Sequence, residues 1–509
     1  MTSVILVVGI VGSFLLLAVY DVLQKKHAIL RNFPVIGHFR YLLEAVGPEL
    51  RQYIVTSNDE ERPFSRDERS WVYASSKQQN NYFGFGTDND LETAEGALII
   101  KQSAFPLPSI MKGAPEFAEG FRVPCAKIMG AHRQRRKAFR PKSVVNISGM
   151  SFGSLSSRAV ESLNRGSHIA GCLHNTGEGG ISSYHEHGGE LIWQIGTGYF
   201  GCRSETGKFD ISRFVDNVER HAVRAIEIKL SQGAKPGMGG MLPAAKITPE
   251  IAQIRGIPMG KDCASPSGHS AFHDVDSLLD FVELLADRSG LPVGIKSAVG
   301  EQTFWAELAQ MMSDSDRGVD FVTVDGGEGG TGAAPLVFSD HVALPFKSGF
   351  VRVYREFIER GLHTKVVFAG SGRLGLPEHA LVAFSLGCDL INVGREAMLS
   401  IGCIQAMRCH TGHCPTGVAT QNRWLIRGLD PNSKANRLAN YVVTLRRELL
   451  SVTRACGHPH PALLTLDHME ILDQQFSSTP LSEVFETQDY SDWGLPGAAD
   501  RDEIQNIMM

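Results

Sequence analysis

Eight short stretches of apolar and β-branched residues recur along the chain, each followed by a turn and most then by a helical pattern. They span 144–149, 171–175, 191–195, 225–230, 292–297, 320–325, 365–370 and 389–394. Several are apolar almost throughout, as is typical of parallel strands buried on both faces of a sheet. Eight strand–helix units predict an α/β fold of the closed (β/α)₈ barrel type rather than an open doubly wound sheet.

The connections between these strands support the same fold. Amphipathic patterns predict helices after the first, fifth, sixth and seventh strands, over 156–171, 301–316, 347–362 and 376–387. The fourth connection is much longer than the others. In a barrel, such an insertion belongs over the carboxyl ends of the strands, where active sites lie. We therefore expect functional residues in this insertion.

Four regions are expected from the sequence. Residues 1–27 form an apolar anchor, 28–140 an irregular α+β lead-in, 141–425 the barrel and 426–509 a helical extension. The composition, 43% hydrophobic and 21% charged, is that of a globular protein and excludes wholesale disorder. The formal net charge of −5 and the lack of a basic block argue against a nucleic-acid partner.

The N-terminal run 4–20 contains no charged residue. A helix of about 20 apolar residues is long enough to cross a bilayer core. Lys25, Lys26 and Arg31 follow it, and the positive-inside rule then places the rest of the chain in the cytoplasm. A cleaved signal peptide is the main alternative, but no basic segment precedes the run and no small-x-small site ends it. A buried core helix is less consistent with a run that is apolar on every side. We expect a single-pass anchor.

Glycine-rich segments follow four of the predicted strands, at 175–180, 231–240, 325–335 and 370–372. Any one of them could be only a tight turn. Glycine also lets backbone N–H groups approach a ligand closely, and all four segments would lie at the same end of the barrel. We therefore expect a ligand there.

The segment GSGRLG (370–375) matches the GxGxxG dinucleotide fingerprint, which suggests NAD. It follows the seventh strand, however, and the acidic residue about 20 positions on, Asp389, begins a strand instead of ending one. Loops after the seventh and eighth strands of a barrel usually bind phosphate. The residues there suggest an FMN phosphate site: Gly370, Ser371, Gly372, Gly394 and Arg395.

Lys229 and Lys296 each lie within an apolar strand. A buried ammonium group needs an anionic partner. A reduced flavin or a substrate carboxylate would serve. The alternative is that each lysine extends to solvent from a strand end.

Three of the nine cysteines, Cys403, Cys409 and Cys414, occur within twelve positions, while the other six are scattered. Their C-x5-C-x4-C spacing fits neither a zinc ribbon nor the C-x2-C-x2-C run of ferredoxins. Three incidental thiols are the alternative to a metal site.

Long ordered motifs give the chain a specific resemblance. They are ISGMSFGSLS, NTGEGG, EIKLSQGAKPGMGG followed by LPAAKITPEIAQIRG, DGGEGGTGAAP and CPTGVATQ. Together they resemble the FMN-binding domain of glutamate synthase, in its short glutamate-synthase-like form, over roughly residues 140–425. The resemblance implies that the three cysteines hold a [3Fe–4S] cluster, which needs only three thiolates.

The resemblance also implies roles for individual residues. Lys229, Lys235 and Arg255 match positions around 2-oxoglutarate, and Glu178 matches a glutamate at the ammonia end of the site. Glu178 and Lys235 are the catalytic candidates. The residues expected to hold FMN are Met150, Ser151, Gln194, Lys296, Gly329, Gly330, Gly370, Ser371, Gly372, Gly394 and Arg395.

One departure from the family pattern affects the substrate. The family's GGQLP reads GGMLP here, so that Met241 replaces a substrate-contacting glutamine, and Met238 replaces a glutamate. Two polar groups become apolar, which puts the identity of the oxo acid in doubt.

The activity implied is reduction of the imine of a 2-oxo acid and ammonia or an amine. A ferredoxin or a separate reductase subunit would supply the electrons. We expect no glutaminase domain or NADPH-binding region in this sequence, and the source of the amine stays open. The alternatives are a related flavin oxidoreductase acting on a different amino or oxo acid, and a membrane-tethered electron-transfer subunit.

Overall fold

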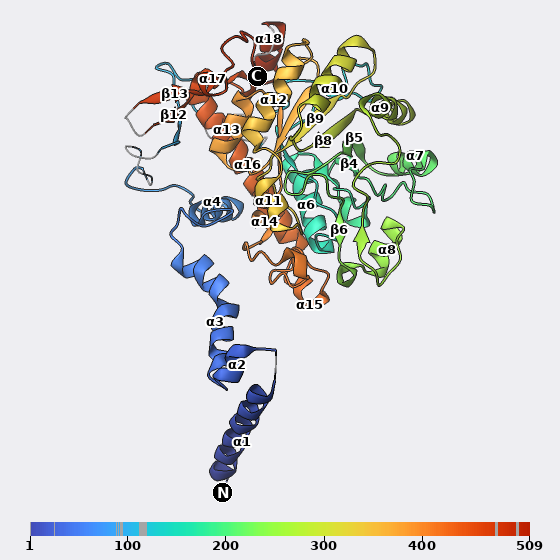
Figure 1. Ribbon diagram of the computed structural model, residues 1–509. Helices are drawn as coiled ribbons and strands as arrows, with labels where there is room; N and C mark the ends of the chain where they lie inside the picture. Colours follow the sequence, from blue (N-terminus) through green and yellow to red (C-terminus); the bar gives the residue numbers. More distant parts are fainter. Residues whose placement is uncertain are drawn as a thin grey trace. The chain divides into compact units, whose positions relative to one another are not determined.

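The computed structural model describes residues 2–24, 26–87, 89, 91, 95–110, 120–473, 477–494 and 498–508. The chain forms two compact units, 1–69 and 70–509 (Figure 1). The domain boundaries expected at residues 27, 140 and 425 remain predictions, and the division in the structure lies between Arg69 and Ser70.

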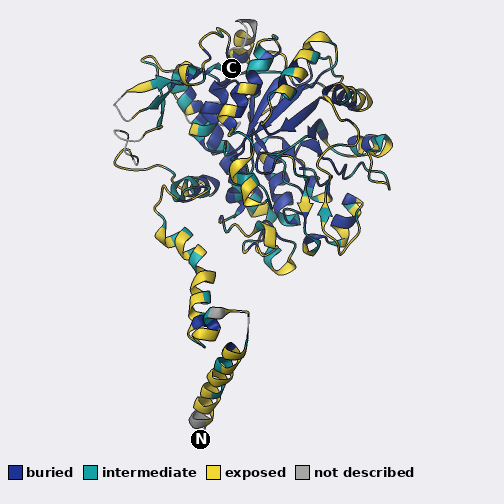
Figure 2. Ribbon diagram, in the orientation of Figure 1, coloured by how far each residue is buried: buried dark blue, intermediate teal, exposed yellow. Residues whose placement is uncertain are grey.

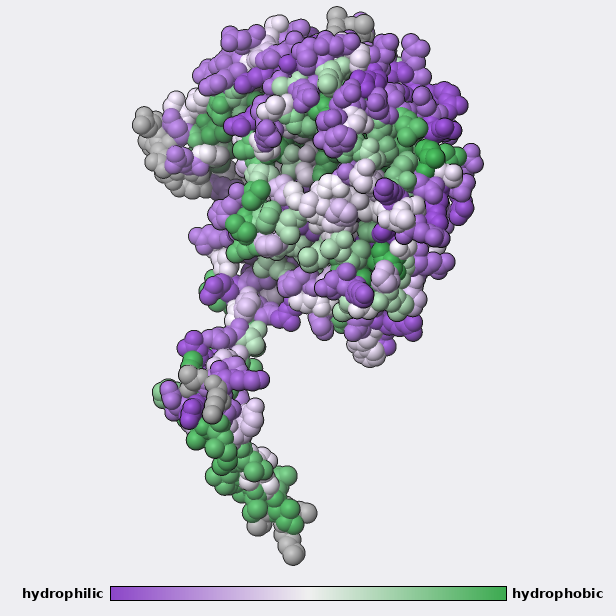
Figure 3. Space-filling model, turned by 45° about the vertical axis from the view of Figure 1, so that its right-hand side comes forward, coloured by the Kyte–Doolittle hydropathy of each residue, from purple (hydrophilic) through white to green (hydrophobic). Residues whose placement is uncertain are grey.

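The first unit is helical. It contains α1 (Thr2–Leu23), α2 (Ala28–Asn32), α3 (Gly37–Leu50) and a short π-helix (Arg51–Val55). Residues Ile5–Leu23 have a mean hydropathy of 2.4, and only 6% of the apolar window is buried. By length and composition, α1 could therefore cross a membrane. Figures 2 and 3 show the exposure and apolar surface of this helix.

The second unit contains a closed barrel of eight strands, ordered β10-β11-β2-β3-β4-β5-β8-β9, and every pairing is parallel. This confirms the predicted fold and all eight predicted strands. The strands are β2 (Val145–Ile147), β3 (His174–Asn175), β4 (Leu191–Ile195), β5 (Val223–Lys229), β8 (Val293–Ser297), β9 (Phe321–Asp325), β10 (Val367–Ser371) and β11 (Leu390–Val393).

The four predicted helices are present as α6, α10, α12 and α13, and further helices follow other strands. In chain order these helices are α6 (Ser157–Ala170), α7 (Ile211–Arg220), α9 (Val275–Ser289), α10 (Thr303–Asp314), α12 (Phe346–Ile358), α13 (Pro377–Ser385) and α14 (Arg395–Ile401). Their ends carry local signals. The Ser156 side chain accepts a hydrogen bond from the Ala159 N–H at the start of α6, and Gly171 ends that helix with a φ of 66°.

An apolar cluster packs the amino-terminal end of the barrel. Cys125, Met129 and Phe139 of the lead-in segment join strand residues such as Leu173 and Phe321 in one buried cluster. Beside this cluster the ion pairs Lys127–Asp389 and Arg135–Asp320 link the lead-in to the starts of β11 and β9, so packing and paired charges close the barrel here.

The insertion after β5 holds a small antiparallel pair, β6 (Met241–Leu242) and β7 (Cys263–Ala264), with α8 (Pro249–Arg255) between them. The short helices α11 (Leu336–His341) and α15 (Arg423–Ile426) follow β9 and the cysteine segment. The insertion therefore brings Met241 and Arg255 to the end of the barrel at which β5 ends.

The C-terminal extension packs against both the barrel and the lead-in. Its long helix α16 (Pro431–Ala455) contacts α6, where a Cβ on Gly166 would lie 2.8 Å from Leu438. The extension is not wholly helical. Its strands β12 (Met469–Leu472) and β13 (Ser478–Pro480) form a sheet with β1 (Leu98–Ile100), and α17 (Leu481–Val484) and α18 (Ala498–Ile507) follow.

Deleting residues 1–26 should move the protein to the soluble fraction without lowering the melting temperature of the barrel, because the two units are separately compact. Membrane fractionation and thermal circular dichroism of the full and shortened chains measure both effects. A full-length protein that is soluble without detergent, or a shortened one that melts markedly earlier, would contradict this.

Candidate active site at the carboxyl ends of the strands

Most predicted site residues lie at or just beyond the carboxyl ends of the barrel strands, which the parallel order brings to one end. Met150 and Ser151 follow β2, and Glu178 follows β3. Gln194, Lys229 and Lys296 lie within the last two residues of β4, β5 and β8. The strand order therefore gathers these predicted residues at one end of the barrel, and their roles remain predictions.

Glu227, which the sequence reasoning missed, lies fully buried inside the barrel on β5. Its Oε2 atom accepts hydrogen bonds from Asn175 Nδ2 (2.6 Å) and Gln194 Nε2 (2.7 Å). Its Oε1 atom accepts one from Thr323 Oγ1 (2.8 Å). A signal for it was present, because Glu227 stands two residues before Lys229 and so points to the same side of the strand.

The two strand lysines are neutralised by protein carboxylates. Lys229 Nζ lies 2.8 Å from Glu178 Oε1, and Lys296 Nζ lies 3.2 Å from Asp325 Oδ2. Burial acts to lower the pKa of Lys296, but the nearby carboxylates, Asp325 and Glu227 first, together outweigh it and the pKa is raised. The sequence argument expected a flavin or substrate as the anionic partner. The structure corrects this, so the lysines by themselves do not require a ligand.

Positive charge nevertheless exceeds negative charge around Glu178. Burial acts to raise the pKa of this carboxyl, but Lys229, Arg255 and Lys235 outweigh it, and the pKa is lowered. Burial lowers the pKa of Lys235, and Lys229 lowers it further. With all four groups ionised, three cations face one carboxylate, an excess of two positive charges. Such a site favours an anion of charge −2.

Arg255 has donor capacity left for such an anion. Its side chain is 5% exposed, and its Nη2 donates to the Phe152 carbonyl (3.0 Å) and weakly to Ser151 Oγ (3.4 Å). Its Nε atom is buried and finds no hydrogen-bond partner among the described residues. A buried donor without an acceptor is costly, and a bound carboxylate would supply one.

Glycine is required on both sides of Glu178. A Cβ at Gly196 or at Gly240 would lie 2.5 Å from one of the two carboxylate oxygens. The loop after β4 and the insertion therefore close around this side chain, and any larger residue would displace it. A cavity of about 350 Å³ lies close by, lined in part by Phe200, on which Arg255 stacks, and by Cys263. A second cavity, of about 370 Å³, is lined by residues before β10 and β11, at the other end of the barrel.

The glycine loops after β9, β10 and β11 lie against one another. The Gly326 N–H donates to the Ser371 carbonyl (2.8 Å), and a Cβ at Gly330 would lie 2.8 Å from Arg395 Cδ. Gly372 has a φ of 127°, which favours glycine, and Gly394 precedes α14.

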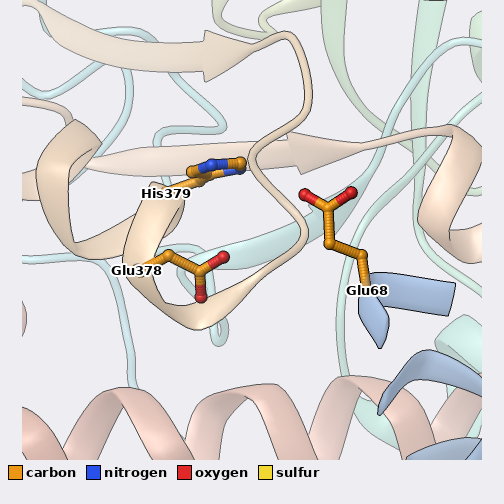
Figure 4. Close-up of side chains that lie close together, drawn as sticks. All are labelled: Glu68, Glu378 and His379. Atoms are coloured by element: carbon orange, nitrogen blue, oxygen red, sulfur yellow. The ribbon is translucent and has the colours of Figure 1, made fainter. Parts of the chain in front are cut away.

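The loop after β10 is also held from α13. His379 lies beside Glu378 on the first turn of this helix (Figure 4), and its Nδ1 atom hydrogen-bonds to the Arg373 carbonyl (2.9 Å). Burial lowers the pKa of Arg395, whose guanidinium donates to the Glu328 carbonyl. Backbone N–H groups, a serine hydroxyl and a partly buried guanidinium suit a phosphate group.

Met241 follows Gly240 in the chain but is largely exposed. Its side chain is 52% exposed, and it pairs with Ala264 across the β6–β7 ladder. Met238 is only partly exposed, in the loop that leads to β6. Contact of either methionine with a substrate remains a prediction.

The cysteine segment favours the thiolate form of one of its cysteines, Cys414. Burial acts to raise the pKa of Cys414, but hydrogen bonds from backbone N–H groups, that of Ala419 first, and from the Thr416 side chain outweigh it, and the pKa is lowered. Burial raises the pKa of Cys409, and the charge of Cys414 raises it further, which indicates that these two cysteines lie close together. Cys403 Sγ accepts a hydrogen bond from the Gln405 N–H (3.4 Å). The six scattered cysteines are free thiols: Cys125, Cys172, Cys202, Cys263, Cys388 and Cys456.

Comparisons with known proteins agree with this arrangement. The conserved region of glutamate synthase matches residues 121–459. The chain is 37% identical over 500 residues to the glutamate synthase large subunit-like protein YerD of Bacillus subtilis, covering 91% of this chain and 94% of the relative. It is 35% identical over 318 residues to the archaeal glutamate synthase [NADPH] of Methanocaldococcus jannaschii, covering 62% of this chain and 59% of that relative.

Solved structures offer a more distant likeness. A mandelate oxidase mutant with a monooxide FMN adduct aligns with 87% of this chain and 99% of its own, at 13% identity and a TM-score of 0.41. At this level the likeness says nothing about ligand or reaction.

Replacing Glu227 with Ala should lower the free energy of unfolding by about 3–5 kcal/mol, because three buried donors lose their acceptor and Lys296 loses a neighbouring negative charge. Urea unfolding followed by circular dichroism measures this. Glu219→Ala, at an exposed position on α7, is the matched control and should change little. A similar loss in both variants would contradict the role of the buried network.

Proposed function

The chain belongs to the glutamate synthase family, whose members are oxidoreductases of amino and oxo acids, and from this premise we propose a more specific activity. We propose that the protein carries FMN and a [3Fe–4S] cluster and reduces the imine of a 2-oxo acid and ammonia or an amine to an amino acid. 2-Oxoglutarate is the oxo acid that we favour.

The excess positive charge around Glu178 carries the proposal. Lys229, Lys235 and Arg255 face a single carboxylate and are almost wholly buried. A dicarboxylate such as 2-oxoglutarate has a charge of −2, which would make the site neutral. A monocarboxylate would leave one buried cation uncompensated, which is unfavourable.

Two side chains are proposed to act on the reacting groups. Glu178 has a lowered pKa and stays ionised, so its carboxylate suits an ammonium ion or a cationic amine next to the oxo acid. Lys235 has a lowered pKa and donates to the Ala333 carbonyl (3.2 Å), and a less basic ammonium group is a better proton donor. Arg255 would orient the substrate through its unpartnered Nε.

The residues at the carboxyl ends of the strands fit an FMN. Gln194 and Lys296 lie inside the barrel at the strand ends, where they would face the ring, and Met150 and Ser151 follow β2 beside them. The phosphate would bind the loops after β9, β10 and β11, with Gly329, Gly330, Gly370, Ser371, Gly372, Gly394 and Arg395. When bound, FMN supplies hydride transfer, and the protein supplies its orientation.

Cys403, Cys409 and Cys414 are proposed to hold the cluster. The N–H groups that lower the pKa of Cys414 favour the thiolate that iron requires. When bound, the cluster supplies one-electron transfer to the flavin. A ferredoxin or a separate reductase subunit is the proposed donor of electrons.

A second candidate function is reduction of an imine from a different, less polar oxo acid or amine. Met238 and Met241 favour it, because they place two apolar side chains in the insertion that also carries Arg255. This candidate keeps both cofactors and the arginine.

The N-terminal helix supports a proposal about location. Because α1 is apolar and exposed over a length that spans a bilayer, and basic residues follow it, we propose a single-pass anchor with the barrel on the cytoplasmic side.

Replacing Lys235 or Arg255 with Met should weaken 2-oxoglutarate binding by roughly 30- to 100-fold, since each removes a charge-assisted contact of about 2–3 kcal/mol. Flavin absorbance changes on titration with 2-oxoglutarate give the dissociation constant, and the oxidised flavin spectrum shows that FMN stays bound. Lys208→Met, at an exposed position, is the control. Unchanged binding in both site variants would place the substrate elsewhere.

Replacing Cys409 with Ser should remove iron and acid-labile sulfide from anaerobically purified protein, because a cluster ligand is lost. Cys202→Ser, at a buried and scattered cysteine, should keep both. Colorimetric iron and sulfide assays compare the two variants with the parent. Stoichiometric zinc without sulfide in the parent would rule out the cluster.

A further inference from the structure

Lys246 is a buried lysine that neither the sequence motifs nor the proposed reaction accounts for. It ends a 3-10 helix (Ala244–Lys246) in the insertion after β5, and its side chain is 4% exposed. Its Nζ atom donates to the carbonyls of Cys409 (2.6 Å) and Ala419 (3.1 Å), with a longer contact to that of Ser154 (3.5 Å). This ammonium group therefore joins the insertion to the cysteine segment.

The hydrogen bonds of Lys246 differ from those of the other buried lysines. Lys229 and Lys296 each face a carboxylate at 2.8 Å and 3.2 Å, whereas the acceptors of Lys246 among the described residues are backbone carbonyls. Carbonyl dipoles offset only part of the cost of burying an ammonium ion. A negative charge is needed near Lys246.

The contacts of Lys246 place its charge against the cysteine segment. Its Nζ atom donates to the carbonyl of Cys409 itself and to that of Ala419, five residues after Cys414. Because Lys246 is buried there, its ammonium group is held where it can offset the negative charge of thiolates at Cys409 and Cys414.

Lys246 also stands near the proposed substrate residues in the chain. Thr248 caps α8 by accepting a hydrogen bond from the Ile251 N–H, and α8 ends at Arg255. The lysine that contacts the cysteine segment is therefore held on the same short segment as the arginine proposed to bind the oxo acid.

We propose that Lys246 is the counter-ion of the Cys409 and Cys414 thiolates and acts as a positioning residue between the metal site and the oxo-acid site. This inference rests on the proposed function in so far as the thiolates carry the [3Fe–4S] cluster. Taking up one electron makes the ligated cluster more negative by one charge. A fixed cation beside two of its three ligands favours that reduced form and raises the reduction potential.

The test compares Lys246→Met with the parent in the full-length, anaerobically purified protein. A redox titration with dithionite, followed by electron paramagnetic resonance of the cluster, gives its midpoint potential. We expect Lys246→Met to lower it by about 59 mV, which is a tenfold change in a one-electron equilibrium. Lys246→Arg keeps the charge and should restore most of the shift.

Lys261→Met is the matched control, because Lys261 lies in the same insertion but is exposed. It should leave the potential unchanged. A cluster of unchanged potential in Lys246→Met, or an equal shift in the Lys261 variant, would overturn the inference while leaving the proposed function intact. A parent protein without iron and sulfide would instead overturn the cluster assignment, before any variant is compared.

If Lys246→Met does not retain iron, the iron contents of Lys246→Arg and Lys246→Gln are compared instead. Circular dichroism first establishes that the two variants are equally folded. Retention with Arg and loss with Gln supports the counter-ion. Equal retention or equal loss in these two variants overturns it.

Discussion

Charge buried inside a closed barrel is the constraint on which the candidate site depends. Glu227 has no access to solvent, so donors on three other strands, β3, β4 and β9, must satisfy its carboxylate. The hydrogen bond from Gln194 fixes that side chain, and the negative charge of Glu227 favours the protonated form of the nearby Lys296. The side chains that would face a flavin are therefore oriented before any ligand binds, which is how a polar site reduces reorganisation during a reaction.

The same constraint divides the cations of the site into two kinds. Lys229 and Lys296 are neutralised within the protein, whereas Lys235, Arg255 and Lys246 have no carboxylate of their own among the described contacts. The ion pairs of Lys229 and Lys296 link the ends of β5 and β8 to the loop after β3 and to the end of β9. The other three leave charge for the ligands proposed above, which are an oxo acid at Lys235 and Arg255 and metal-bound thiolates at Lys246.

The fold could be predicted from sequence because its signal is local. Each barrel strand is an apolar run buried on both faces, and each predicted helix carries its own amphipathic pattern. The sheet of β1 with β12 and β13 was missed because its strands are short and because β1 is separated from the other two by most of the sequence. The helix α7 was also missed, although Phe214 and Val218 give it a buried face.

The sequence indicated at which end of the barrel the candidate residues lie, but not which residues they contact. The glycines of 231–240 were interpreted as making room for a ligand, yet Gly240 makes room for Glu178, and Gly233 and Gly239 lie against backbone carbonyls. The partners of the buried lysines and the roles of Glu227 and Lys246 depend on residues brought together from distant strands. Sequence spacing alone does not contain those pairings.

The central claim is that the protein reduces the imine of 2-oxoglutarate and ammonia with electrons held on its flavin. Reoxidation of the flavin in anaerobically reduced full-length protein, followed by absorbance, tests this most directly. We predict reoxidation on addition of 2-oxoglutarate and ammonium together, with glutamate formed in equal amount, and little with either alone. Reoxidation only by another oxo acid and amine, or by no such pair, would contradict the claim.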